Sequence, residues 1–118
     1  MCKILVVDDE KNIRTVFQKT LEADGHIVDT AANSAEALAL AAQKKYKLAL
    51  LDIQLPDMLG TELLKELKKI QPELISVMVT GDTTLQNAVD SLNQGAEAYI
   101  RKPVNKEQLL AVIQEKAG

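Results

Sequence analysis

The sequence predicts an α/β domain with three layers (α/β/α), in which one five-stranded parallel sheet lies between two layers of helices. The first observation behind this prediction is that five short apolar runs alternate with segments of helical spacing. The second is that no Ser/Gly-rich linker or low-complexity segment interrupts the alternation, so residues 1–118 are expected to form one domain. The length of 118 residues agrees with this, because it suits a single domain with a core of ordinary size.

The five apolar runs are expected to be the strands of the sheet. Three of them are continuously apolar instead of alternating, which is typical of strands buried on both faces of a parallel sheet. These three are therefore expected to be central strands. In chain order the runs are Ile4 to Val7, Ile27 to Val28, Leu48 to Leu51, Ile75 to Val79 and Ala98 to Ile100.

The segments after the strands are expected to be helices that bury one apolar stripe each against the sheet. The second segment, Ala35 to Lys45, is Ala-rich and is assigned to a helix on propensity and on Asn33 followed by Glu36, the spacing of a capping box. The stripes of the other four are Ile13, Val16, Phe17 and Leu21; Leu63, Leu64, Leu67 and Ile70; Leu85, Ala88, Val89 and Leu92; and Leu109, Leu110, Val112 and Ile113.

Residues that end or begin helices fall between these segments. Gly25, Pro72 and Gly95 stand where the first, third and fourth helices should end, and Asn105 with Gln108 has the spacing of a second capping box. The result is a (βα)₅ pattern, which predicts right-handed crossovers and helices on both faces of the sheet. For five strands the common solution is the flavodoxin-like order 2-1-3-4-5.

The composition excludes several classes of function. With 14 basic and 17 acidic residues the net charge is -3, so the chain has no electrostatic footprint for a nucleic-acid backbone, and direct nucleic-acid binding is not expected. Cys2 is the single cysteine, which excludes an intramolecular disulfide and fits a reducing compartment. No stretch approaches the length of a membrane span. We therefore expect a cytoplasmic protein with no membrane partner.

Polar residues with chemical potential follow four of the five predicted strands. Asp8 and Asp9 follow the first, Asp52 the third, Thr80 the fourth and Lys102 the fifth. Since the carboxyl ends of parallel strands lie at one edge of a sheet, and ligands bind at that edge near the switch point between strands one and three, these side chains should converge. Each has a structural alternative taken singly, such as a helix cap or a solvated lysine. Their shared edge favours a site.

Three carboxylates at one edge would repel one another at neutral pH unless a cation compensates them. Hard oxygen ligands suit Mg²⁺, Mn²⁺ or Ca²⁺, and an incomplete protein cage that leaves room for water and a phosphoryl oxygen favours Mg²⁺. Beside such a cation a carboxylate can attack phosphorus. Lys102 and Thr80 are suited to contact the phosphoryl oxygens.

Four segments, in the right order and covering nearly the whole chain, resemble the receiver domains of two-component response regulators. They are VVDDE after the first strand, LLDIQLPDMLG around the third, VMVTGD at the fourth and AYIRKP at the fifth. The resemblance implies that Asp52 accepts a phosphoryl group from a phosphohistidine of a sensor histidine kinase or a phosphotransfer protein. It also implies a Mg²⁺ site formed by Asp8, Asp9, Asp52 and the backbone carbonyl of Gln54.

The same resemblance implies how a signal leaves the site. Thr80 and Lys102 would contact the phosphoryl group, Tyr99 would turn inward when Thr80 moves, and the Lys102-Pro103 bond would be cis. The changed surface would be the fourth helix, fifth strand and fifth helix, which acts on a downstream effector and is a possible homodimer interface. Members that dimerise there usually carry a second acid at the position of Ala98.

The sequence also leaves three other interpretations open. A Mg²⁺-dependent phosphatase of the haloacid dehalogenase type also passes through an aspartyl phosphate, but Asp8-Asp9-Glu10-Lys11 lacks the spacing of its motif. A flavin or nucleotide binder of the same fold would need a phosphate loop after the first strand. A degenerate receiver would serve only as an interaction module. His26 is expected to be solvated and not to act as a phosphodonor.

Overall fold

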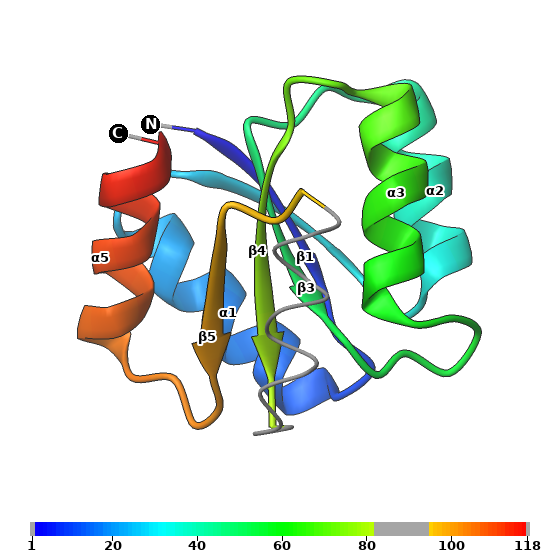
Figure 1. Cartoon of the computed structure of the whole chain (residues 1–118). Coiled ribbons are helices and arrows are strands. Elements are labelled where there is room, and N and C mark those ends of the chain that lie inside the picture. Colours follow the sequence, from blue (N-terminus) through cyan, green and yellow to red (C-terminus); the bar gives the residue numbers. More distant parts are fainter. Residues whose placement is uncertain (1, 82–94, 118) are drawn as a thin grey trace.

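The computed structural model describes residues 2–81 and 95–117, and within them a five-stranded sheet is packed on both faces by helices (Figure 1). Along the chain the elements are β1 (Lys3–Val7), α1 (Lys11–Ala23), β2 (Ile27–Ala31), α2 (Ser34–Gln43), β3 (Leu48–Asp52), α3 (Gly60–Ile70), β4 (Ile75–Thr80), β5 (Ala98–Arg101) and α5 (Lys106–Ala117). All pairings are parallel and the strand order is β2-β1-β3-β4-β5, which confirms the predicted order.

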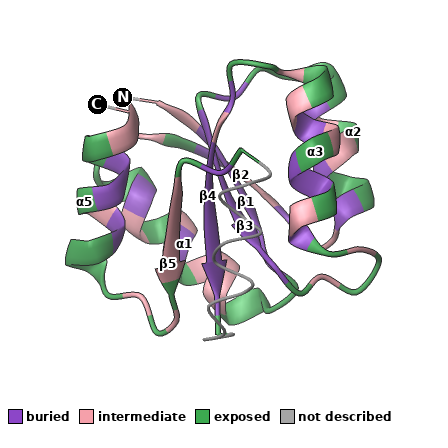
Figure 2. Ribbon diagram, in the orientation of Figure 1, coloured by how far each residue is buried: buried purple, intermediate pink, exposed green. Residues whose placement is uncertain are grey.

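Two apolar clusters hold the layers together, one on each face of the sheet. In Figure 1, α1 and α5 lie on one side of the sheet and α2 and α3 on the other. Alternate residues of one strand serve the two faces, so that Ile4 and Val6 of β1 pack with α1 and α5, whereas Leu5 and Val7 belong to the cluster with α2 and α3. Figure 2 shows β1, β3 and β4 buried along their length, as their continuous apolar runs predict.

Two helix starts carry the predicted capping residues. The box before α5 is complete, since the Gln108 N–H donates to Asn105 Oδ1 at 2.7 Å and the Asn105 N–H donates to Gln108 Oε1 at 3.3 Å. Before α2, Asn33 accepts from the Glu36 N–H at 2.9 Å, but the Glu36 carboxylate accepts from the Ala32 N–H instead of the Asn33 N–H. The α2 box is therefore confirmed in one of its two halves.

The second strand is longer than predicted, and the fourth predicted helix cannot be compared. β2 continues through Asp29 and Thr30, which pair with Leu5 and Val6 of β1. Because β2 is an edge strand, polar residues are tolerated along it, and the apolar pattern therefore ends before the pairing does. The stripe from Leu85 to Leu92 lies outside the described residues. In the part of the chain that is described, no helix has the length and apolar character to cross a membrane.

Candidate phosphoacceptor site

The sheet register brings the predicted site residues to one edge. Asp52 is the last residue of β3 and Thr80 the last of β4, while Asp8 follows β1 directly. The Lys102 N–H donates to the Thr80 carbonyl at 2.8 Å, which places Lys102 one step beyond the pairing of β4 with β5. The Lys102-Pro103 peptide bond is cis, as predicted. All four side chains therefore start from strand ends and not from long loops.

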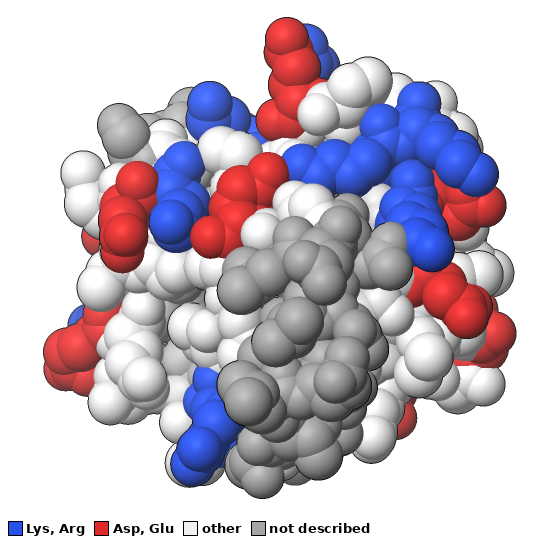
Figure 3. Space-filling model, viewed as in Figure 1, with Lys and Arg blue, Asp and Glu red and all other residues white. Residues whose placement is uncertain are grey.

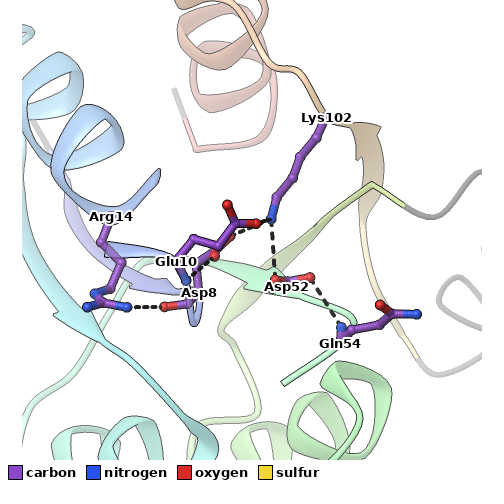
Figure 4. Close-up of polar contacts among 6 residues, drawn as sticks. All are labelled: Asp8, Glu10, Arg14, Asp52, Gln54 and Lys102. Atoms are coloured by element: carbon purple, nitrogen blue, oxygen red, sulfur yellow. Dashed lines mark hydrogen bonds and ion pairs between the residues drawn. The ribbon is translucent and has the colours of Figure 1, made fainter. Parts of the chain in front are cut away.

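The Lys102 ammonium group lies between two buried carboxylates (Figure 4). Its Nζ is 2.8 Å from Asp8 Oδ2 and 3.3 Å from Asp52 Oδ2, and 3.6 Å from Glu10 Oε1 on the open side. The other oxygen of Asp52, Oδ1, accepts from the Gln54 N–H at 3.2 Å. Each oxygen of Asp52 thus has a partner, which fixes the plane of its carboxylate.

Burial and charge act on Asp52 and Lys102 in opposite ways. Burial raises the pKa of the Asp52 carboxyl and the charge of Asp8 adds to it, while Lys102 and the Gln54 N–H offset only part of the effect. For Lys102, burial works to lower the pKa, but the hydrogen bond to Asp8 and the charge of Asp52 outweigh it, so the pKa is raised. The cation is therefore firmly charged beside a carboxylate whose ionisation is opposed.

Three acids at the start of α1 form a cluster that fits a hard cation. One carboxylate oxygen from each of Asp8, Asp9 and Glu10 lies within 4.8 Å of the others, and Asp8 is buried whereas Asp9 and Glu10 are exposed. Oxygen ligands on one side with open space on the other suit Mg²⁺, which keeps several waters. The predicted pair Asp8 and Asp9 is therefore part of a potential metal site, and Glu10 adds a third acid to it.

Arg14 of α1 hydrogen-bonds to the backbone of the acid cluster. Its guanidinium donates to the Asp8 carbonyl at 2.6 Å, and the Glu10 N–H donates to Asp8 Oδ1 at 2.9 Å. Figure 4 shows Arg14 on the side of Asp8 away from Lys102. The turn that carries the acids is thus fixed through both its backbone and the Asp8 side chain.

An open hollow of about 370 Å³ lies over these residues. Its lining includes Asp52, Gln54, Thr80 and Lys102, with Asp9, Glu10 and Gly81 completing the rim. Thr80 is 1% exposed, and its strand partner is Arg101, while Tyr99 of β5 pairs with Met78 and packs against the cluster on the α2 and α3 face. Tyr99 therefore lies on the neighbouring strand and not in the hollow.

Gly60, the first residue of α3, packs directly on the backbone of Asp52. A Cβ at this position would lie 2.1 Å from the Asp52 carbonyl oxygen, and the Gly60 N–H donates to the Ile53 carbonyl at 2.6 Å. Only glycine allows this approach. The start of α3 and the end of β3 are therefore fixed to each other immediately beyond Asp52.

Sequence reasoning missed several of these contacts and misjudged one residue. Glu10, Arg14 and Gly60 were not identified, although a third acid after Asp8 and Asp9 and a Gly at a helix start were visible signals. The expectation that His26 is solvated is wrong. Its side chain is 9% exposed, its Nδ1 accepts from the Cys2 N–H at 3.0 Å, and its Nε2 is 3.3 Å from Asp24 Oδ2. The cause is the packing of the N-terminal residues against β2.

Comparison with known proteins decides the family. Residues 4–114 match the family described as the response regulator receiver domain. This chain belongs to that family. A receiver domain is a signalling switch and not an enzyme, is phosphorylated on an aspartate as in two-component response regulators, and has a histidine kinase as its partner. The assignment decides against the phosphatase and the nucleotide-binding interpretations.

Solved receiver structures agree over almost the whole chain. A CheY-like response regulator receiver domain protein from Methanospirillum hungatei is 48% identical, with a TM-score of 0.93, over 97% of this chain and 91% of that one. A response regulator from Burkholderia pseudomallei, solved with a phosphorylated aspartic acid and a calcium ion, is 33% identical with a TM-score of 0.90. The match extends over 98% of this chain and 68% of the Burkholderia pseudomallei chain.

The curated relatives are longer than this receiver domain. The transcriptional regulatory protein YkoG of Bacillus subtilis is 38% identical over 93% of this chain, which spans 48% of YkoG. The DNA-binding transcriptional regulator NtrC of Escherichia coli is 35% identical over 94% of this chain, which spans 24% of NtrC. The chain therefore corresponds to about half of one relative and a quarter of the other.

Proposed function

We propose that Asp52 is the phosphoacceptor of this receiver domain and that Asp8, Asp9, Asp52 and the Gln54 carbonyl hold Mg²⁺ beside it. The observation that carries the proposal is the position of Lys102, whose ammonium group contacts both Asp8 and Asp52 at the floor of a hollow that Thr80 also lines. A cation, a buried carboxylate and a hydroxyl at one sheet edge are the groups that a transferred phosphoryl group requires.

In the proposed reaction an oxygen of Asp52 forms a bond to phosphorus while the bond from phosphorus to the phosphohistidine nitrogen breaks, and the electron pair returns to the imidazole. The Gln54 N–H and Lys102 hold the Asp52 carboxylate in a fixed plane, which favours an in-line approach. Lys102 then neutralises phosphoryl charge, and the Thr80 hydroxyl donates to a phosphoryl oxygen. When bound, Mg²⁺ would supply further charge neutralisation and orientation of the phosphoryl group.

We further propose that Thr80 and Tyr99 carry the switch. Thr80 is buried at the end of β4, and the pairing of β4 with β5 connects it directly to the strand that holds Tyr99. A phosphoryl group that binds one arrangement of Thr80 better than another would shift the population of both. The proposed output is the surface of β5, α5 and the predicted fourth helix, where an effector or a second copy would bind. The proposed location is the cytoplasm, supported by the cysteine content.

Acetyl phosphate with Mg²⁺ tests the proposal without a kinase. The wild-type chain should gain one phosphoryl group by intact mass, and Asp52→Asn should gain none. Asp29→Asn is the matched control, because Asp29 is a strand aspartate that contacts Tyr46 and Lys44 and does not line the hollow. This control should phosphorylate normally. No adduct on the wild type, or an adduct that survives Asp52→Asn, would overturn the assignment.

A further inference from the structure

The loop that follows the phosphoacceptor, residues 53–59, is exposed along much of its length but is tied down at several points. At its base, the Gly60 N–H donates to the Ile53 carbonyl, and Gln54 forms an isolated bridge with Leu59. Leu55 and Met58 pack against the core cluster on the α2 and α3 face. The two backbone ties close the base of the loop on itself, and the apolar packing holds its inner side against the core.

Asp57 supplies a tie to another element. Its carboxylate accepts from the Ser34 N–H at 2.9 Å and from the Ala35 N–H at 3.0 Å, both in the first turn of α2. The Ser34 hydrogen bond, with that of Ala35, holds the pKa of the Asp57 carboxyl below its usual range although the side chain is exposed. Asp57 is therefore bound to α2 as a carboxylate.

Two residues accept from the free N–H groups in the first turn of α2, Asn33 and Asp57. The Glu36 N–H donates to the Asn33 side chain at 2.9 Å, and the Ala37 N–H forms the first bond within the helix, to the Asn33 carbonyl at 3.2 Å. Ser34 and Ala35 are left, and the loop carboxylate takes both. Because the first four N–H groups of a helix have no partner within the helix and attract negative charge, this end of α2 is complementary to Asp57. The helix is thus capped partly by its own N-cap and partly by the loop.

We propose that Asp57 is a positioning residue for the phosphorylation site, which acts by anchoring the loop that carries Gln54 to α2. Gln54 orients Asp52 through its N–H and, by the proposed function on which this inference rests, binds Mg²⁺ through its carbonyl. It lies three residues before Asp57 in the same loop, and Asp57 hydrogen-bonds that loop to α2. With the anchor in place, the Gln54 carbonyl is held where the metal needs it. Without the anchor, the loop must be ordered when the metal binds.

Two variants separate anchoring of the loop from capping of the helix. Asp57→Asn keeps the shape of the side chain but leaves one acceptor oxygen for two N–H donors. Asn33→Ala removes the other cap of the same helix turn, whose side-chain hydrogen bonds are with Glu36 and not with the loop. Both should weaken α2 by a similar amount, since each removes a cap interaction. Only Asp57→Asn should disturb the metal site.

The measurement is the Mg²⁺ dissociation constant of the folded chain, followed by the shifts of backbone amide NMR signals in the loop. Asp57→Asn should raise the constant about tenfold, as loss of an outer partner of a metal ligand commonly does, and Asp57→Ala should raise it further. Asn33→Ala should leave it within about twofold. In the metal-free chain, hydrogen exchange at Ser34 and Ala35 should accelerate in both Asp57 variants.

The outcomes distinguish this inference from the proposed function. If the wild type binds no Mg²⁺, the proposed ligand set fails and the anchoring role fails with it. If the wild type binds Mg²⁺ and Asp57→Asn binds it equally well, or if Asn33→Ala weakens it as much, the ligand set stands and the anchoring role alone is overturned.

Discussion

Two aspartates of the same sheet, Asp52 and Asp29, are held in opposite ways. At the end of β3, burial and the neighbouring Asp8 raise the pKa of Asp52. In the middle of β2, Asp29 Oδ2 accepts from the Tyr46 hydroxyl at 2.7 Å and from Lys44 at 3.3 Å. The Tyr46 hydrogen bond lowers the pKa of Asp29, burial opposes it, and Lys44 adds to the lowering. The surroundings of Asp52 disfavour its ionised form, whereas those of Asp29 favour it.

The difference separates stability from reactivity. Asp29 and Tyr46 form a satisfied pair whose charge lies beside a lysine, so that the pair stabilises the fold. Asp52 lies in a group of acids that one lysine only partly offsets, so a cation or a phosphoryl group bound there would change the charge balance of the site. The surface of the molecule carries charges of both signs. Figure 3 shows basic side chains gathered over α3, with acidic side chains beside them on the same face.

Of the changes considered, removal of the Lys102 ammonium group between Asp8 and Asp52 should have the largest effect on stability. Lys102→Met keeps an apolar stem but leaves Asp8 and Asp52 facing each other without compensation. Because both carboxylates are buried, we expect a loss of about 3 kcal/mol in the free energy of unfolding at neutral pH without divalent cations. Urea denaturation measures it. Millimolar Mg²⁺ should restore part of the loss through binding to the folded state. An unchanged stability would show that the carboxylates do not repel as described.

Removal of the charge from each of the two aspartates in turn tests whether their surroundings act in opposite ways. Asp29→Asn should lose about 1 kcal/mol, since the hydrogen bond from Tyr46 no longer ends on a charge. Asp52→Asn should lose nothing or gain up to about 1 kcal/mol, because it removes a buried charge whose ionisation is opposed. Thermal or urea unfolding of both variants, without divalent cations, decides the matter. Equal losses in the two would contradict the assignment of opposite roles.

The smallest expected effect is the pH dependence of Tyr46→Phe. Near neutral pH the variant should be about 1 kcal/mol less stable, because Asp29 loses a partly buried hydrogen bond. The pKa of Asp29 is lowered in the folded protein, so Asp29 contributes stability at pH values above the ordinary pKa of an aspartate. This contribution is lost as the pH falls through the pKa of Asp29 in the folded protein. Burial raises the pKa of Tyr46, and the hydrogen bond to Asp29 raises it further. The stability that Tyr46 contributes is therefore complete below about pH 10, the ordinary tyrosine pKa, and is lost as the pH rises through the pKa of Tyr46 in the folded protein.

The gap between wild type and Tyr46→Phe should therefore shrink at both ends of the pH range. Urea midpoints measured from acid to alkaline pH test this. The Asp29→Asn variant serves as the control, because its gap to the wild type should shrink on the acid side in the same way. A gap that stays constant down to the acid limit would mean that the Tyr46 contact does not depend on the charge of Asp29.

Most of the fold was predictable because central strands of a parallel sheet are buried on both faces. Such strands show continuous apolar runs, and the runs at Leu48 and Ile75 reproduce β3 and β4 within one residue. The pattern failed at β2, where Asp29 and Thr30 pair with β1 but read as polar. The half-buried Asp29 carboxylate accepts from Tyr46, 17 residues further along the chain, which satisfies its charge within the strand. Sequence periodicity cannot show such a contact.

The site was predictable where it rests on strand ends and not where it rests on loops. Asp52, Thr80 and Lys102 follow apolar runs, so the parallel sheet alone brings them to one edge. Arg14 and Asp57 act through backbone groups, on the Asp8 carbonyl and on the first turn of α2. Almost every residue type supplies those backbone groups, so the sequence contains no pattern that would pair them. They become visible only once the loop conformations are known.

The most direct test of the central claim is to identify the modified residue itself. The wild-type chain is treated with acetyl phosphate and Mg²⁺, reduced with borohydride, which converts an aspartyl phosphate to homoserine, and digested for peptide mass spectrometry. Homoserine is expected in place of Asp52, with Asp8, Asp9, Asp29 and Asp57 unchanged. Conversion at any of those four aspartates in place of Asp52, or at none of the five, would contradict it.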